Sequence, residues 1–289
     1  MLSSLNTAQK GILSALLGYT SFALADACAK WLSAYYETVH VIFWVYCSAL
    51  IFGIILSPFL GGLKNTLNTK KLLIHLGRGV CAFAIAMLVV TSLRELSLAM
   101  LYTILFLAPF LTTIAAIPIY KEPVPLKNWV IIAIGFSGII VAFRPDITEI
   151  TPAVIYAFSS LFFIVALGLL SRPLAKSETL LSLSFYPSIS VLFLLGTALL
   201  PEAPLPQTQH IPVFLFNGLC VVVGLGGIAH GYRIAPFSIV APIHYTQMVI
   251  ALILGYLIFS DIPNLWMMAG ASIIIVSGIM LAISSQKSK

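Results

Sequence analysis

Charge is what this sequence has least of. Only 8% of its 289 residues are Asp, Glu, Lys or Arg, whereas soluble domains carry roughly a quarter. So few charges exclude a water-soluble globular domain. The net charge of +6 comes from basic residues spread over short connections and segment ends rather than gathered in one patch, so no nucleic-acid partner is expected.

Cysteine is also scarce. The chain has 4 cysteines, Cys28, Cys47, Cys81 and Cys220, and all of them fall inside apolar stretches. Free thiols in such stretches behave as small apolar groups, so neither a secreted disulfide scaffold nor a metal cluster is expected. A Gly-x-x-x-x-Gly-Lys-Ser/Thr loop is absent from the sequence as well, which argues against ATP hydrolysis by this chain.

Long apolar runs fill the sequence instead: 60% of the residues are hydrophobic. Runs near 20 residues suffice to cross a hydrocarbon core of about 30 Å. The pattern predicts an all-α polytopic membrane protein with ten transmembrane helices. The predicted segments are residues 11–32, 39–60, 72–92, 98–119, 128–143, 151–170, 180–200, 211–230, 237–259 and 265–284. The first run leads directly into further segments, so it is interpreted as an anchor rather than a cleaved signal peptide.

The distribution of basic residues predicts the orientation. With the amino terminus in the cytoplasm, twelve of the 15 basic residues lie inside, as the positive-inside rule requires. Those twelve are Lys10, Lys64, Lys70, Lys71, Arg78, Lys121, Lys127, Arg172, Lys176, Arg233, Lys287 and Lys289. The outer side keeps Lys30, Arg94 and Arg144. Both termini are therefore expected in the cytoplasm.

The sequence also matches itself at an offset of 139 residues. The matched pairs are Gly79 with Gly218, Cys81 with Cys220, Arg94 with Arg233, and Glu122 with Asp261. The offset spans five predicted helices, an odd number, so the second half would be inserted upside down. Two inverted halves, residues 1–145 and 146–289, are typical of secondary transporters that work by alternating access through a mid-membrane site.

Asp26 is the acidic residue that lies inside an apolar run, about 22 Å along the helix from residue 11. A carboxylate at that depth is costly unless it faces a cavity or a partner. Two interpretations stay open. Asp26 could bind a cationic group of a substrate or couple transport to protons, or it could form a structural ion pair with Lys30, four residues later on the same face.

The ninth predicted segment carries a polar cluster shortly after Pro242. His244, Tyr245, Thr246 and Gln247 are consecutive, and a proline frees a backbone carbonyl, which is tolerated where a helix lines a cavity. These side chains either contact a substrate or serve as hydrogen-bonding glue between helices. Substrate contact is the favoured interpretation for His244, Tyr245 and Gln247.

Several further side chains are candidates for a central site. Aromatic rings that could stack on a flat or cationic ligand are Tyr19, Trp44, Tyr46, Tyr102 and Tyr186, with Tyr102 the best placed. Asn217 and Arg78, at corresponding ends of the eighth and third segments, either face the central space or anchor helix ends.

Small and acidic residues near the segment ends have structural interpretations. Gly224, Gly226, Gly227 and Gly231 crowd the eighth segment, where they either allow close helix packing or act as a hinge. Glu122 and Asp261, at the membrane edges, are expected to cap helices or to pair with Lys or Arg.

Two sets of motifs resemble the EamA repeat of the drug/metabolite transporter superfamily. The first runs from Arg94–Ala99 through Ala108-Pro109 and Tyr120-Lys121-Glu122-Pro123 to Gly135 and Gly138; the second runs from Tyr232-Arg233 through Ala241-Pro242 to Asp261 and Gly278. Asp26 to Lys30, together with Arg144-Pro145-Asp146, is similar to the branch that contains S-adenosylmethionine uptake carriers. The resemblance implies ten helices, a central cavity and no ATP-driven machinery.

The leading hypothesis is a secondary active transporter of a small polar metabolite, amino-acid-like or S-adenosylmethionine-like, in a bacterial inner membrane. An exporter of amino acids, drugs or other metabolites is the alternative. An integral-membrane enzyme is a third class, which the dispersed acids do not favour. The expected partners are a small-molecule substrate, the lipid bilayer and a proton or counter-substrate, with no cofactor. The chain is expected to be a monomer or a homodimer.

Overall fold

The structure, a computed structural model, describes residues 6–121, 124–143, 151–174, 177–199, 205–235 and 240–284. Within these ranges all regular elements are helices. The α-helices are α1 (Thr7–Leu32), α2 (Thr38–Ile55), α3 (Leu63–Leu67), α4 (Leu72–Leu93), α5 (Leu98–Leu105), α6 (Ala108–Tyr120), α7 (Leu126–Ala142), α8 (Pro152–Ser171), α9 (Ser182–Leu199), α10 (Ile211–Ile234), α12 (Thr246–Phe259) and α13 (Leu265–Ser284). Short 3-10 helices are η2 (Ser57–Phe59), η3 (Arg172–Leu174), η4 (Thr208–His210) and η5 (Ala241–Tyr245).

Length and composition make this a polytopic membrane protein, as the sequence predicts. In the described part of the chain, 6 helical spans are long and apolar enough to cross a membrane, and further apolar helices are shorter. The long spans are Gln9–Leu32, Thr38–Ile55, Leu72–Leu93, Leu98–Tyr120, Pro152–Ser171 and Thr208–Ile234. The shorter ones are Leu126–Ala142, Ser182–Gly196, Ile243–Phe259 and Leu265–Leu281.

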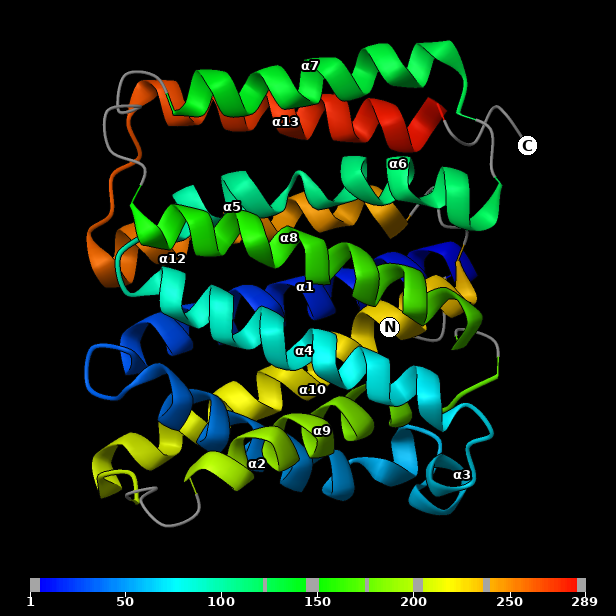
Figure 1. Ribbon diagram of the computed structural model, residues 1–289, viewed down its shortest axis with the longest axis vertical. Helices are drawn as coiled ribbons and strands as arrows, with labels where there is room; N and C mark the ends of the chain where they lie inside the picture. Colours follow the sequence, from blue (N-terminus) through cyan, green and yellow to red (C-terminus); the bar gives the residue numbers. More distant parts are fainter. Residues whose placement is uncertain are drawn as a thin grey trace.

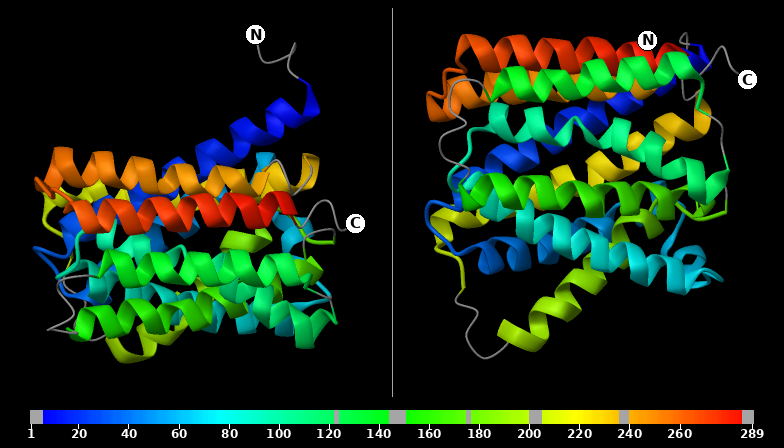
Figure 2. Two further views of the ribbon diagram at one scale, coloured as in Figure 1. Left: turned by 90° about the horizontal axis from the view of Figure 1, so that it is seen from above. Right: turned by 45° about the horizontal axis from the view of Figure 1, so that its top comes forward.

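The long helices run side by side, and the connections gather at two ends of the bundle (Figure 1). One end holds Lys30 in the last turn of α1 and is called the Lys30 end. The opposite end holds the α8–α9 connection with Glu178 and is called the Glu178 end. The start of α1 and the end of α13 both lie at the Glu178 end (Figures 1 and 2).

Helices from distant parts of the sequence pack in a regular scheme. α1 packs on α10, and α4 packs on α8. α2 also contacts α10, as α9 contacts α4. Three further pairs are α7 with α13, α5 with α12, and α2 with α9. The α7–α13 pair forms one edge of the bundle (Figure 1).

Glycines bring α1 and α10 into backbone contact. A Cβ on Gly227 would lie 2.7 Å from the Ser14 carbonyl oxygen, and a Cβ on Gly18 would lie 2.7 Å from the Ile228 nitrogen. A Cβ on Gly231 would lie 3.0 Å from the Gly11 carbonyl oxygen. The set Gly11, Gly18, Gly227 and Gly231 is called the glycine seam. Its geometry confirms the packing interpretation of the small residues in this segment.

Gly79 and Gly218, which the self-match pairs, have the same role in helix packing. A Cβ on Gly79 of α4 would collide with the Ser190 side chain of α9. A Cβ on Gly218 of α10 would lie 2.6 Å from the Ala49 nitrogen of α2. Each glycine therefore allows close approach to a helix from the other half of the sequence.

Two predicted segments are not α-helical over their whole described length. The segment predicted at 98–119 divides into α5 and α6, because Pro109 lacks the amide that would bond to the Leu105 carbonyl. The amide of Leu107 bonds instead to the Ile104 carbonyl at 3.0 Å, which tightens the turn. In the segment predicted at 237–259, residues Ala241–Tyr245 form the 3-10 helix η5 before α12 begins.

Some predicted features lie outside the described residues. They include Glu122, Pro123, the Arg144-Pro145-Asp146 motif and Lys176, together with the start of the ninth segment and the carboxyl-terminal lysines Lys287 and Lys289.

Candidate functional site

Asp26 lies in α1, about 9 Å before the helix ends at the Lys30 end. Its side chain is half-buried. The hydroxyl of Tyr102, from α5, donates a short hydrogen bond to Asp26 Oδ2. A carboxylate at membrane depth is thus bound to a neutral donor from another helix rather than to a basic side chain.

Tyr102 joins Asp26 to a third helix. Gln247 Nε2, from α12, donates a hydrogen bond of 2.7 Å to the Tyr102 hydroxyl oxygen. Tyr102 and Gln247 are 2% and 7% exposed. The chain of donors from Gln247 through Tyr102 to Asp26 therefore runs through the interior of the bundle and joins α12, α5 and α1. We call these three residues the carboxylate triad.

Aromatic rings pack near the triad, around His244 of η5. The ring of His244 stacks on Tyr19 of α1 at 4.7 Å between centroids and meets the edge of Phe106 at 5.1 Å. Phe106 also lies 5.8 Å from Tyr102 and 5.4 Å from Tyr245. The turn that follows α5 and the 3-10 helix that precedes α12 thus bring these rings together. Aromatic faces of this kind favour contact with a flat or cationic group.

Asn217 of α10 bonds to the backbone of α1 beside Asp26. Asn217 is 1% exposed, and its Nδ2 donates a 3.0 Å hydrogen bond to the Ala25 carbonyl. Asn217 therefore positions α1. Tyr46 of α2, another candidate, is half-buried.

The structure therefore brings together predicted candidates from four of the predicted segments. They are Tyr19, Asp26, Tyr102, Asn217, His244, Tyr245 and Gln247. Sequence analysis did not identify Phe106 as a site residue, because it is apolar. The signal that would have found it is the self-match, since an offset of 139 places Phe106 on Tyr245, and the two rings are in contact.

Lys30 is not paired with Asp26, so the alternative of an Asp26–Lys30 ion pair is wrong for this structure. Lys30 Nζ instead lies 2.9 Å from Asp261 Oδ2 and donates a 2.9 Å hydrogen bond to the Leu96 carbonyl. The physical reason is that the α12–α13 connection brings a carboxylate to the Lys30 end. Asp261 pairs with a basic residue, as the sequence analysis expects of it.

Tyr186 and Arg78 lie elsewhere, near the Glu178 end. The ring of Tyr186 stacks on His75 at 4.4 Å, and its hydroxyl donates to the Thr66 carbonyl at 2.9 Å. Arg78 Nε donates to Ser171 Oγ at 3.0 Å. Arg78 thus ties α4 to α8, which corresponds to its anchoring interpretation.

Glu178 is the centre of a network at that end. Thr69 Oγ1 donates to Glu178 Oε1 at 3.0 Å, and His75 Nε2 lies 3.3 Å from Glu178 Oε2. Arg233 of α10 donates a short hydrogen bond to the Glu178 carbonyl. Lys71 Nζ donates to the Pro173 carbonyl at 2.6 Å. These bonds connect α4, α10 and the α8–α9 connection.

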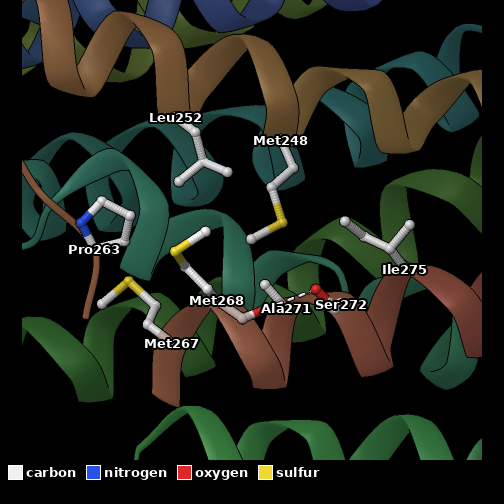
Figure 3. Close-up of a pocket in the computed structure, with 8 residues that line it drawn as sticks. All are labelled: Met248, Leu252, Pro263, Met267, Met268, Ala271, Ser272 and Ile275. Atoms are coloured by element: carbon white, nitrogen blue, oxygen red, sulfur yellow. Dashed lines mark hydrogen bonds between the residues drawn. The ribbon is translucent and has the colours of Figure 1, made fainter. Parts of the chain in front are cut away.

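A small apolar cavity of about 80 Å³ lies between α12 and α13. Figure 3 shows Met248 and Leu252 directed from α12 towards Met268 and Ala271 of α13. Ser272 Oγ donates a hydrogen bond of 2.8 Å to the Met268 carbonyl. α12 therefore presents Gln247 to the triad and an apolar face to α13, and this cavity is too small and apolar for a polar metabolite.

The four cysteines are free. Across the described ranges, no group of three or more His, Cys, Asp or Glu side chains is placed to hold a metal ion. The polar groups of the triad are suited to hydrogen bonding and charge recognition.

Comparison with known proteins finds a family and several transporters that this chain resembles. A family model described as the EamA-like transporter family matches residues 9–144. The chain is 25% identical to the S-adenosylmethionine uptake transporter of Rickettsia prowazekii (strain Madrid E), covering 100% of this chain and 97% of that protein. It is 26% identical to the transporter of the same name in Rickettsia conorii (strain ATCC VR-613 / Malish 7), covering 99% and 97%.

Other relatives carry other names. The chain is 23% identical to a riboflavin transporter of Vibrio cholerae, with 93% of this chain and 91% of that protein covered. A solved crystal structure superposes with a TM-score of 0.68 over 98% of this chain and 100% of that chain, at 14% identity. At that identity the likeness shows the fold alone. Residues 9–144 thus match the EamA-like transporter family, and proteins named as transporters resemble the chain along its whole length.

Proposed function

We propose that this membrane transporter of small metabolites is a secondary active carrier, and that the carboxylate triad is its substrate site. Its substrate is a small polar metabolite with a cationic group, S-adenosylmethionine or an amino-acid-like solute. The observation that carries the proposal is Asp26, a carboxylate inside the bundle that is bound by Tyr102 and, through it, by Gln247. An ionisable residue inside a membrane bundle marks a transport pathway by default.

Asp26 supplies the recognition chemistry. An ammonium or sulfonium group is attracted to a carboxylate far more strongly at low dielectric than in water. Tyr19, Phe106 and His244 pack on one another near the triad, and we propose that this aromatic cluster receives the rest of the solute. Asp26 can also carry a proton between the two sides of the membrane, so coupling to protons and exchange for a second solute both remain compatible with the site.

Two inverted halves, residues 1–145 and 146–289, are the architecture we infer for the alternating access. The helix packing supports it. When each of the first five predicted segments is exchanged with the segment five places later, every packed pair named above becomes another such pair or itself. The pair α1–α10 becomes α8–α4, and α2–α10 becomes α9–α4. Gly79 and Gly218 exchange in the same way. Such repeats place the substrate site where the halves meet.

The carrier is assigned to a bacterial inner membrane with both termini in the cytoplasm. The bacterial origin of the relatives supports the membrane, and the excess of basic residues at the Glu178 end supports the orientation. On that assignment the Lys30 end faces outwards. The names of the relatives favour uptake over export.

Substrate uptake into proteoliposomes that contain the Asp26→Asn variant tests the proposal. Labelled S-adenosylmethionine is supplied outside, and initial uptake is compared with wild type and with Glu37→Gln. Glu37 is an exposed residue at the start of α2, so its variant makes the same charge change away from the triad. We expect Asp26→Asn to lose uptake and Glu37→Gln to keep it. Uptake by Asp26→Asn at the wild-type rate would refute the role of Asp26.

A thermal-shift panel identifies the solute. S-adenosylmethionine, S-adenosylhomocysteine, amino acids and riboflavin are each added to the purified protein. A ligand at a concentration of 100 times its Kd raises the free energy of unfolding by about 2.7 kcal/mol. A shift with S-adenosylmethionine that Asp26→Asn abolishes supports the cationic substrate class. A shift with riboflavin alone would replace that class by a neutral aromatic one.

A further inference from the structure

An open cavity of about 420 Å³ lies at the Lys30 end. It is formed where α1, α4 and α12 end, and its lining residues include Lys30, Trp31, Tyr35, Arg94 and Phe259. No acidic residue is among the described residues that line it. The lining therefore combines two basic groups with aromatic surface, which attracts anions.

The aromatic wall of this cavity is held in place by its neighbours. The rings of Trp31 and Tyr35 lie 4.8 Å apart, and each contacts the ring of His210, at 5.2 Å and 4.6 Å. His210 Nδ1 in turn forms a hydrogen bond of 2.7 Å with the Tyr36 hydroxyl. The end of α1 is thus braced against η4, so the cavity is a built feature of this end of the bundle.

Lys30 lies at the boundary between this cavity and the interior. Its side chain is 15% exposed and bonds to Asp261, which is 26% exposed. Its Nζ also lies 4.9 Å from the centroid of the Phe259 ring. A partly wet ion pair exchanges one anion for another far more readily than a dry one, because its desolvation cost is small.

Asp26 and Lys30 share one face of α1. Residues four apart on a helix have Cβ atoms about 5–6 Å from each other. These two opposite charges nevertheless bond to other partners, Tyr102 and Asp261. A solute that carries an anion and a cation a few bonds apart could occupy both, with its cation at Asp26 and its anion at Lys30.

We propose that the cavity at the Lys30 end is the entry site for a zwitterionic α-amino-acid head group, whose carboxylate displaces Asp261 from Lys30 while its cationic group binds Asp26. The inference rests on the proposed function and deepens it. Lys30 becomes a specificity residue, and Asp261 becomes an internal competitor for it. Solutes that lack a carboxylate lose the Lys30 contact but keep the Asp26 contact.

Binding of two matched ligands tests this. S-adenosylmethionine carries the carboxylate, and decarboxylated S-adenosylmethionine keeps the sulfonium and amine without it. Their Kd values are measured by calorimetry on wild type, Lys30→Gln, Asp261→Asn and Lys127→Gln. Lys127 is an exposed basic residue at the opposite end, so its variant controls for the loss of charge.

The two sides of the ion pair have opposite expected effects. Lys30→Gln should raise the Kd of S-adenosylmethionine by about tenfold or more, since a charge-assisted contact is lost. Asp261→Asn should lower the Kd of the same ligand, because the carboxylate that competes for Lys30 is gone. Neither variant should change the Kd of the decarboxylated ligand, and Lys127→Gln should change neither Kd.

Other outcomes overturn the inference. If the ion pair is only structural, Lys30→Gln and Asp261→Asn will affect affinity in the same direction and for both ligands. The proposed function survives that result, because Asp26→Asn still loses both ligands. If wild type binds neither ligand, or Asp26→Asn binds both as wild type does, the proposed function fails and this inference fails with it.

Discussion

Tyr102→Phe removes the one hydroxyl that holds the carboxylate triad together. The substitution keeps the ring that packs beside Phe106 but deletes the donor to Asp26 and the acceptor of Gln247. A buried polar group left without a partner costs about 1–3 kcal/mol. Gln247 is 7% exposed and bears that cost in full. Asp26 is half-buried, so water partly replaces its lost donor.

The summed destabilisation is therefore about 2–4 kcal/mol, and thermal unfolding in detergent measures it. Tyr256→Phe on α12 is the matched control, because Tyr256 is 60% exposed. A bound solute cation would satisfy the carboxylate that Tyr102 leaves, so the shift produced by ligand should be at least as large in Tyr102→Phe as in wild type. Equal unfolding temperatures for Tyr102→Phe and Tyr256→Phe would refute the reasoning about stability. Loss of the ligand shift would show that Tyr102 binds the solute directly.

Two further changes probe the helix contacts. Gly227→Ala places a methyl group 2.7 Å from the Ser14 carbonyl oxygen, and such overpacking costs about 1–3 kcal/mol. The added methyl group of Gly168→Ala, on α8, meets nothing within 4 Å and should stabilise the helix by about 0.5–1 kcal/mol. If the unfolding temperatures of Gly227→Ala and Gly168→Ala moved in the same direction, the packing role of the glycine seam would be contradicted. Glu178→Gln weakens the bonds to Thr69 and His75, so the unfolding temperature should fall by the equivalent of about 1–3 kcal/mol. Its Kd for substrate should stay unchanged, and a changed Kd would show that this network reaches the triad.

The fold class followed directly from the sequence, because the hydropathy of each segment depends only on its own residues and not on how the helices pack. The self-match at 139 residues identified Gly79 and Gly218 as equivalent, and the structure gives both the same role in helix packing. Close helix approach leaves a trace in the sequence, since a Cβ at either position would collide with the neighbouring helix.

The site was predictable in part, for a related reason. Asp26 and Gln247 are conspicuous as polar residues in apolar segments, and both belong to the triad. The partner of Lys30 was not predictable, because Asp261 lies 231 positions away and their meeting depends on how α1 and α12 pack. The 3-10 turn before α6 was missed for a similar reason: hydropathy does not register a missing backbone bond.

The glycine seam has a mechanical consequence for alternating access. Backbones in direct contact have no side chains between them that could slide from one rotamer to another, so α1 and α10 must travel together. In the proposed repeat, α4 and α8 are the counterparts of this pair, and they also pack on each other. In the alternating access that we propose, a moving body therefore contains helices from both sides of residue 145.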